Sequence, residues 1–187
     1  MAAAPSRTVV VGDVAVTAAD NALVATDAPT GKVLWTSPHR SRTAPVIAGG
    51  KIWAAVMCGM GACDLATGRW LGGQEWGWSS SPIVTDGSRV AYTNTHGGIT
   101  LADAESREEI AVVEGALPGF PPMLAGNAML YFAPGGIMRY DFETKKSSAW
   151  FPSPEWMGRP TSPMIMVKSN VYFATDKIGL VCIKPRR

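Results

Sequence analysis

The side chains best suited to binding or chemistry lie in loops that are rich in glycine, serine and proline. The candidates are Trp76, Trp78, His96, Phe120, Trp156 and Arg159. Aromatic rings provide flat apolar area, and a neighbouring arginine or histidine adds polar contacts, which together suit a concave site for a planar or sugar-like ligand. The alternative is that the tryptophans cover strand ends and pack on Pro82 and Pro163. Ligand contact and packing therefore both stay open.

Catalytic patterns are weak. The Ser79-Ser80-Ser81 run lacks the G-x-S-x-G context of a nucleophile, and no His/Asp pair can be matched to it. The second histidine, His39, stands among arginines and is expected at the surface. The sequence leans away from an enzyme, with His96 as the proton carrier if one exists.

The three cysteines predict packing rather than bonding. Cys63 and Cys182 occupy equivalent places in their local patterns, where a side chain points inward. A disulfide between Cys58 and Cys63, five residues apart, is the less favoured alternative. No residues show the spacing of metal ligands, so no metal site is predicted.

Two independent marks recur along the chain and determine which elements position these side chains. Aspartates that open a turn stand at Asp27, Asp64, Asp103 and Asp141, at intervals of 37, 39 and 38 residues. Prolines that precede an apolar run stand at Pro45, Pro82, Pro122 and Pro163, at intervals of 37, 40 and 41 residues. A shared period of this length indicates structural repeats.

Each repeat reads as four short β-strands joined by tight turns, which is the unit of a β-propeller blade. The expected units are 8–44, 45–81, 82–121, 122–162 and 163–187, and the last lacks its outer strand. The prediction is thus an all-β propeller of about five blades in one domain, 1–187. A closed five-bladed ring is slightly favoured over part of a larger propeller or an open arc.

The first unit, V-V-V-G-D-V-A-V-T-A-A-D-N-A-L-V-A-T-D-A-P-T-G-K-V-L-W, resembles the repeat of PQQ-like β-propellers, a group that includes quinoprotein alcohol dehydrogenases. The resemblance implies that turn residues dock neighbouring blades. The matching positions are Asp27, Thr30, Gly31 and Trp35 in the first unit, Asp64, Thr67, Gly68 and a displaced Trp70 in the second, and Asp103 and Asp141 in the next two. Arg107 and Lys145 replace the glycine in the later units, which predicts weaker or different docking there.

Composition excludes several classes of protein. With 47% hydrophobic and 17% charged residues and a net charge of +2, the 187-residue chain is neither disordered nor suited to nucleic acid. No apolar run reaches the length of a membrane span. Residues 1–7 lack the pattern of a signal peptide, which leaves a cytoplasmic protein or a trimmed secreted or periplasmic one.

We expect a non-catalytic binding or scaffolding propeller that contacts a protein partner or small ligand through its loop-rich face. No cofactor is predicted. The alternative is an enzyme that holds a planar substrate, or PQQ with calcium, in a central site; a sugar-binding lectin is a weaker alternative, because the aromatic residues are unevenly spaced. The unfinished terminal blade also suggests oligomerisation through its open edge.

Overall fold

The computed structural model describes residues 7–19, 21–56, 59–74, 78–79 and 81–184, and its regular structure is almost entirely β-strand. The strands form antiparallel sheets in chain order, each a meander of sequential neighbours. Within the described residues, the first four sheets have four strands and the fifth has three. The prediction of an all-β propeller with about five blades, the last lacking its outer strand, is confirmed.

The strands are short and run from the inner to the outer edge of each sheet. The first sheet contains β1 (Arg7–Val11), β2 (Val14–Ala18), β3 (Leu23–Asp27) and β4 (Val33–Ser37). The second contains β5 (Val46–Ala48), β6 (Lys51–Val56), β7 (Gly59–Asp64) and β8 (Trp70–Gln74). The third contains β9 (Val84–Thr85), β10 (Arg89–Thr93), β11 (Ile99–Asp103) and β12 (Glu109–Val113).

The fourth sheet contains β13 (Met123–Ala125), β14 (Ala128–Ala133), β15 (Gly136–Asp141) and β16 (Lys146–Pro152). A short 3-10 helix, η1 (Glu155–Met157), follows β16. The fifth sheet contains β17 (Ile165–Val167), β18 (Asn170–Thr175) and β19 (Gly179–Ile183). The described segments include no helix with the length and apolarity that a membrane crossing requires.

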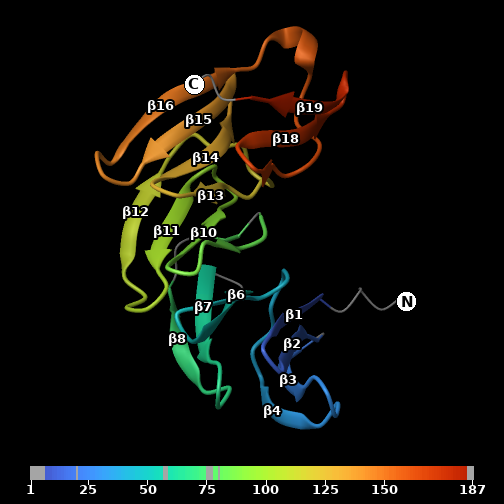
Figure 1. Cartoon of the computed structure of the whole chain (residues 1–187). Helices are drawn as coiled ribbons and strands as arrows, with labels where there is room; N and C mark the ends of the chain where they lie inside the picture. The colour runs from blue at the N-terminus through green and yellow to red at the C-terminus, as the bar shows by residue number, and fades with distance from the viewer. Residues whose placement is uncertain (1–6, 20, 57–58, 75–77, 80, 185–187) are drawn as a thin grey trace.

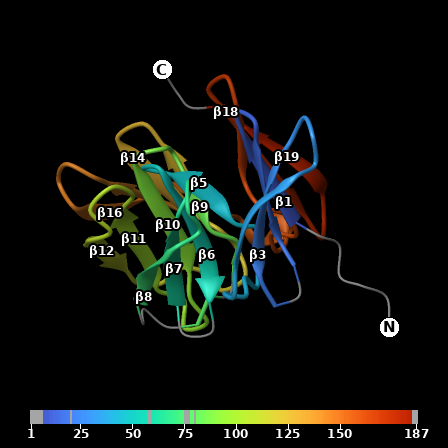
Figure 2. The same cartoon turned by 90° about the horizontal axis from the view of Figure 1, so that it is seen from below.

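The sheets stack face to face along an arc that is open on one side (Figure 1). Seen from below, the outer strands β8, β12 and β16 lie on the same side of the molecule (Figure 2). In Figure 1 the first and fifth sheets stand at opposite ends of the arc, and no described strand of one pairs with the other, so the described residues do not form the slightly favoured closed ring. Large buried side chains such as Trp53 and Tyr92 fill the space between neighbouring sheets.

Each pair of neighbouring sheets encloses its own apolar core. Val16, Leu23 and Ile52 belong to the core between the first and second sheets. Later junctions contain bulkier residues, with Phe132 and Phe173 between the fourth and fifth sheets. The outermost sheets have one uncovered face each, and exposed apolar side chains gather there, for example Val10 at 60% exposure and Leu180 at 74%.

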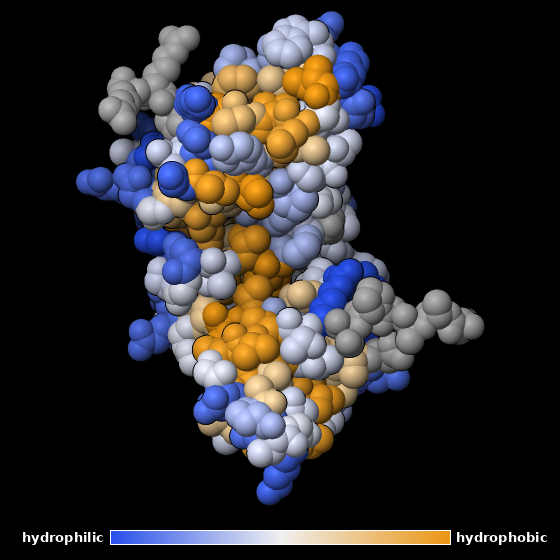
Figure 3. Space-filling view, turned by 45° about the vertical axis from the view of Figure 1, so that its right-hand side comes forward, coloured by the Kyte–Doolittle hydropathy of each residue, from blue (hydrophilic) through white to orange (hydrophobic). Residues whose placement is uncertain are grey.

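Apolar residues also line the open side of the arc. Figure 3 brings this side forward and shows them in a band that runs down the molecule. The inner strands are composed mainly of such residues, as in the Ile165–Val167 sequence of β17, where all three side chains are exposed.

An aspartate organises the turn between the third and fourth strands of the first four sheets. Its Oδ1 atom accepts the backbone N–H of the residue three positions later, at 2.9 Å for Asp27, 2.9 Å for Asp64, 2.7 Å for Asp103 and 3.0 Å for Asp141. These hydrogen bonds are made by the ionised carboxylate and therefore fix the turn most firmly when the aspartate is charged.

The hydrogen bonds lower the pKa of three of these carboxyls below their ordinary value of 3.8. For Asp64 the largest cause is the hydrogen bond from the Thr67 hydroxyl. For Asp103 and Asp141 it is the backbone N–H of Ser106 and Thr144, respectively. The recurring aspartates are thus committed to turn structure.

The first junction docks through a tryptophan. Trp35 in β4 donates its indole N–H to the carbonyl of Leu65 at 3.0 Å, and its ring lies against Gly68 in the turn of the second sheet. A Cβ atom at Gly68 would overlap the indole ring, so this close approach requires glycine. The turn of one sheet is thereby held by the outer strand of its neighbour.

At the second junction the outer strand contributes the small residue and the facing turn contributes the large one. Gly72 pairs with Ala62 as Trp35 pairs with Ala25, so Gly72 occupies the tryptophan position. Facing it, Arg107 occupies the glycine position of the next turn and keeps the left-handed backbone, with φ of 69°. Its guanidinium donates to the carbonyl of Leu71, beside Gly72.

Trp70 turns toward the first sheet instead. It pairs with Cys63, packs in the core between the first and second sheets, and lies on Gly61. The ring of His39 stacks on it, with centroids 4.0 Å apart, so His39 is half-buried rather than a surface residue. At the third junction, the guanidinium carbon of Arg89 lies 4.3 Å from the ring centre of Phe142.

Candidate functional site

A pocket of about 890 Å³ opens on the loop-rich face between the fourth and fifth sheets. In a four-stranded meander, the turns between second and third strands share one end of the sheet with the connections to the next sheet. Segments of both kinds form the pocket here: the β12–β13 connection, the β14–β15 turn, the β16–β17 connection and the β18–β19 turn. Its position is therefore a direct result of the repeat.

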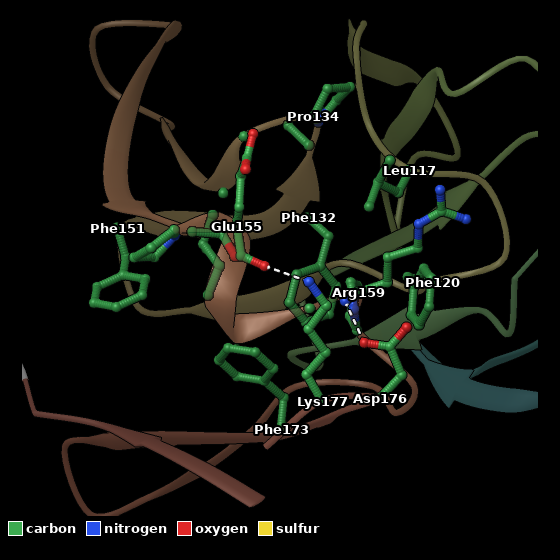
Figure 4. Close-up of a pocket in the computed structure, with 18 of the residues that line it drawn as sticks. Leu117, Phe120, Phe132, Pro134, Phe151, Glu155, Arg159, Phe173, Asp176 and Lys177 are labelled. Carbon is green, nitrogen blue, oxygen red and sulfur yellow. Dashed lines mark hydrogen bonds between the residues drawn. The ribbon is translucent and has the colours of Figure 1, made fainter. Parts of the chain in front are cut away.

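Phenylalanine rings form the apolar wall of the pocket (Figure 4). Phe132 lies at the centre, with the rings of Phe120 and Phe173 edge-to-face on it at centroid distances of 5.3 and 5.2 Å. Phe132 and Phe173 are each 4% exposed, and Phe120 and Phe151 are half-buried. Edge-to-face contacts fix the orientation of these rings, so the wall is preformed.

Polar groups hold the rim. The Asp176 carboxylate accepts the backbone N–H of Arg159 at 2.8 Å, and the Asp176 N–H donates to the carbonyl of Arg159 at 3.0 Å. Lys177 Nζ donates to the carbonyl of Glu155 at 2.9 Å. These bonds fasten the β16–β17 connection to the β18–β19 turn.

Gly158 allows the two segments to come this close. Its φ of 84° is in the left-handed region, and a Cβ atom there would collide with the Asp176 carboxylate. The glycine in the sequence W-M-G-R-P therefore shapes the rim of the pocket.

The Arg159 side chain is available for other contacts. Within the described part of the chain, its guanidinium has no hydrogen-bond or ion-pair partner. In Figure 4 it extends toward Leu117 and Phe120, while the Glu155 carboxylate extends toward Pro134. A cation thus stands over the aromatic wall.

Of the residues singled out from the sequence, the pocket brings together Phe120 and Arg159. Trp156 lies in η1 between pocket residues, with 63% of its surface exposed. Trp78 is 46% exposed and packs under Arg42, whose guanidinium carbon is 4.7 Å from the ring centre. His96 is exposed in the β10–β11 turn, away from the pocket lining. Trp76 lies outside the described residues.

Sequence reasoning missed the central rings, Phe132 and Phe173, because strand residues were assigned to packing alone. A signal was present. The sequence Tyr-Phe-Ala occurs at 131–133 and again at 172–174, at the same place in successive units. A large aromatic residue near the loop end of two neighbouring second strands is what builds an aromatic wall between them.

Neither of the two described cysteines, Cys63 and Cys182, lines the pocket. Cys63 is buried beside Ser37, and burial raises the pKa of its thiol. The packing role predicted for Cys182 is wrong, because Cys182 is exposed and alternates along β19 with the buried Val181 and Ile183. Cys58 lies outside the described residues, so its suggested bond to Cys63 is not described either. In the described segments, no three His, Cys, Asp or Glu side chains gather around a point where a metal ion could sit, and Asn94 Oδ1 accepts the N–H groups of His96 and Gly98.

No protein-family model matches the chain, and no curated protein matches its sequence. Solved structures do match its fold. BamB from Moraxella catarrhalis superposes with a TM-score of 0.72 at 19% identity, over 92% of this chain and 55% of that one. Quinohemoprotein alcohol dehydrogenase from Comamonas testosteroni gives 0.62 at 17%, over 90% and 39%.

The computationally designed Ika4 protein gives a TM-score of 0.60 at 15% identity, over 82% of this chain and 94% of that one. The chain therefore spans about half the length of BamB, and its arc follows the curvature of that longer propeller. The resemblance seen in the repeat agrees with these matches in space. The chain has the β-propeller fold of proteins built from PQQ-like repeats.

Proposed function

We propose that this protein is a non-catalytic binding module that contacts a protein partner through the pocket between its fourth and fifth sheets. The observation that carries the proposal is the preformed aromatic wall beside a rim that is fastened by backbone hydrogen bonds. A rigid apolar site costs little conformational entropy on binding, and aromatic and arginine side chains dominate the energetics of protein interfaces.

One further feature favours a protein partner. Trp156 is largely exposed on the same connection as Glu155 and Arg159, where it can extend a contact beyond the pocket.

Site-specific photo-cross-linking tests the proposal. A benzophenone amino acid replaces Glu155 at the pocket rim, and in a matched control it replaces Glu143, an exposed residue of the turn at the opposite end of the fourth sheet. In an extract of the source organism, the Glu155 position should give a cross-linked protein of one defined mass.

The same cross-link should be absent from the Glu143 variant and much reduced when Phe120→Ala is added. Equal yields from both positions, or no discrete product from the pocket position, would overturn the proposal. Circular dichroism of each variant confirms that it is folded before the comparison is made.

A further inference from the structure

The charged groups around the pocket differ in how many of their hydrogen-bonding atoms are already used. Arg159 presents a guanidinium without a partner in the described segments, and Lys177 Nζ uses one of its three N–H donors on the carbonyl of Glu155. Asp176, by contrast, spends its Oδ1 atom on the backbone of Arg159. Arg159 and Lys177 thus retain N–H donors at the rim of the pocket.

The remaining carboxylate is directed elsewhere. Figure 4 shows the Glu155 side chain extending toward Pro134, on the opposite side of the pocket from the Arg159 guanidinium. An anion that approached the Arg159 guanidinium would therefore meet unused N–H donors on the side of the pocket away from the Glu155 carboxylate, while the Asp176 carboxylate stays bound to the backbone of residue 159. Next to an apolar wall, such a charge-assisted hydrogen bond is stronger than in open water.

The wall selects for an aromatic group. Phe120, Phe132 and Phe173 form an edge-to-face series, and an inserted ring can continue this series at the half-buried Phe120. The pocket volume of about 890 Å³ is ample for one side chain with its flanking backbone. The wall and the free cation together define the chemistry of the occupant.

We propose that the pocket binds an aromatic side chain that lies beside a carboxylate, on an extended acidic segment of a protein partner. The aromatic ring enters against Phe120 and Phe173, and the adjacent carboxylate accepts hydrogen bonds from Arg159. Exposed Trp156 lies along the flanking backbone of that segment. This assignment rests on the proposed function, because it names the recognition chemistry of that same site.

Two fluorescent dyes test the chemistry independently of any partner. Anilinonaphthalene sulfonate carries an aromatic system and an anion, and N-phenyl-1-naphthylamine is its neutral analogue. We expect Arg159→Gln to weaken binding of the sulfonate about tenfold, as for the loss of a charged hydrogen bond, and to leave the neutral dye unchanged. Phe120→Ala should weaken both dyes.

A control variant separates the pocket from the uncovered face of the fifth sheet. Leu180→Gln removes an apolar side chain that is 74% exposed on β19, outside the pocket, and should leave both dissociation constants unchanged. If Arg159→Gln affects both dyes equally, or if Leu180→Gln abolishes the sulfonate signal, the assignment is overturned.

Two peptides then test the source of the ligand. Acetyl-Ser-Asp-Phe-Asp-Ser-amide should shift the backbone amide resonances of Gly158 and Asp176 at lower concentration than acetyl-Ser-Asn-Phe-Asn-Ser-amide. Arg159→Gln should remove the difference. Equal binding of the two peptides would overturn the acidic-segment assignment even if photo-cross-linking identifies a protein partner, so the two proposals fail separately.

Discussion

The first two junctions between sheets each pack a large side chain against a glycine, but the large side chain comes from opposite sides of the junction. At the first, the large Trp35 of one sheet lies on the small Gly68 of the next. At the second, the small Gly72 faces the large Arg107. The bulk that fills the joint comes from the outer strand in one case and from the turn in the other.

The difference teaches that a lost motif residue need not mean a lost contact. Judged from sequence, the second unit lacks the tryptophan at its expected position and the third lacks the glycine, which predicted weaker or different docking. The two departures compensate each other across one interface. Arg107 satisfies the carbonyl of Leu71, as Trp35 satisfies that of Leu65.

The largest effect is expected from removing the aromatic joint. Trp35→Ala deletes a half-buried indole and its hydrogen bond to Leu65, and should lower the free energy of unfolding by about 3 kcal/mol. Urea denaturation followed by circular dichroism measures it. The control, Trp156→Ala, removes a largely exposed indole and should change stability by less than about 0.5 kcal/mol. Equal losses in the two variants would show that Trp35 is not a docking residue.

Two glycine substitutions, Arg107→Gly and Lys145→Gly, test whether these turn residues contribute to the packing between sheets. Arg107 and Lys145 both have left-handed backbone, with φ of 69° and 55°, but among the described residues only Arg107 has a side-chain hydrogen bond to the neighbouring sheet. Lys145→Gly should relieve strain and stabilise by about 0.5–1 kcal/mol. Arg107→Gly loses a charged hydrogen bond as well and should destabilise by about 1 kcal/mol net.

The same denaturation experiment measures this pair. Changes of opposite sign in the free energy of unfolding would confirm that the Arg107 side chain docks neighbouring sheets and the Lys145 side chain does not. A stabilised Arg107→Gly protein would mean that the contact with Leu71 contributes little.

A smaller effect is expected on the pH dependence of stability. Because the folded-state pKa of Asp103 lies below its ordinary value of 3.8, its stabilising contribution is complete above that value and is lost as the pH falls through the folded-state pKa. Asp103→Asn should therefore be less stable than the parent near neutral pH, and the difference should narrow below about pH 4. Thermal melts across this range test it, and parallel curves would contradict the assignment.

The last prediction concerns the chemical reactivity of two cysteines rather than stability. It compares Cys63, which is buried, with Cys182, which is exposed. In a Cys58→Ser background, iodoacetamide should modify exposed Cys182 quickly. Cys63 should react only in denaturant, because burial raises the pKa of its thiol. Mass spectrometry after short labelling reads both sites, and rapid labelling of Cys63 would show that the first junction opens readily.

The fold was predictable because the turns of each repeat are determined by residues close together in the sequence. The side chain of each recurring aspartate makes its hydrogen bonds within three residues, so the turns could be inferred without knowledge of distant contacts. The direction of Trp70 could not be inferred in this way. The pairing register shifts between Ala62 and Cys63, and Trp70 and Gly72, two residues apart, therefore lie on opposite faces of the sheet.

The site was predictable in part for a related reason. Loop residues such as Phe120 and Arg159 could be assigned to one face from topology alone. Which of the loops would converge depends on the packing of one sheet against the next. The aromatic wall arises from Phe132 and Phe173, which belong to different sheets and meet only after docking.

The hydrogen bonds between Asp176 and the backbone of Arg159 have a consequence for the binding specificity of the pocket. Asp176 holds only the backbone N–H and carbonyl at position 159, so any residue except proline, which lacks the N–H, can keep these two hydrogen bonds. Position 159 is therefore a place where selection, natural or in a combinatorial library, can exchange one recognition chemistry for another without rebuilding the scaffold.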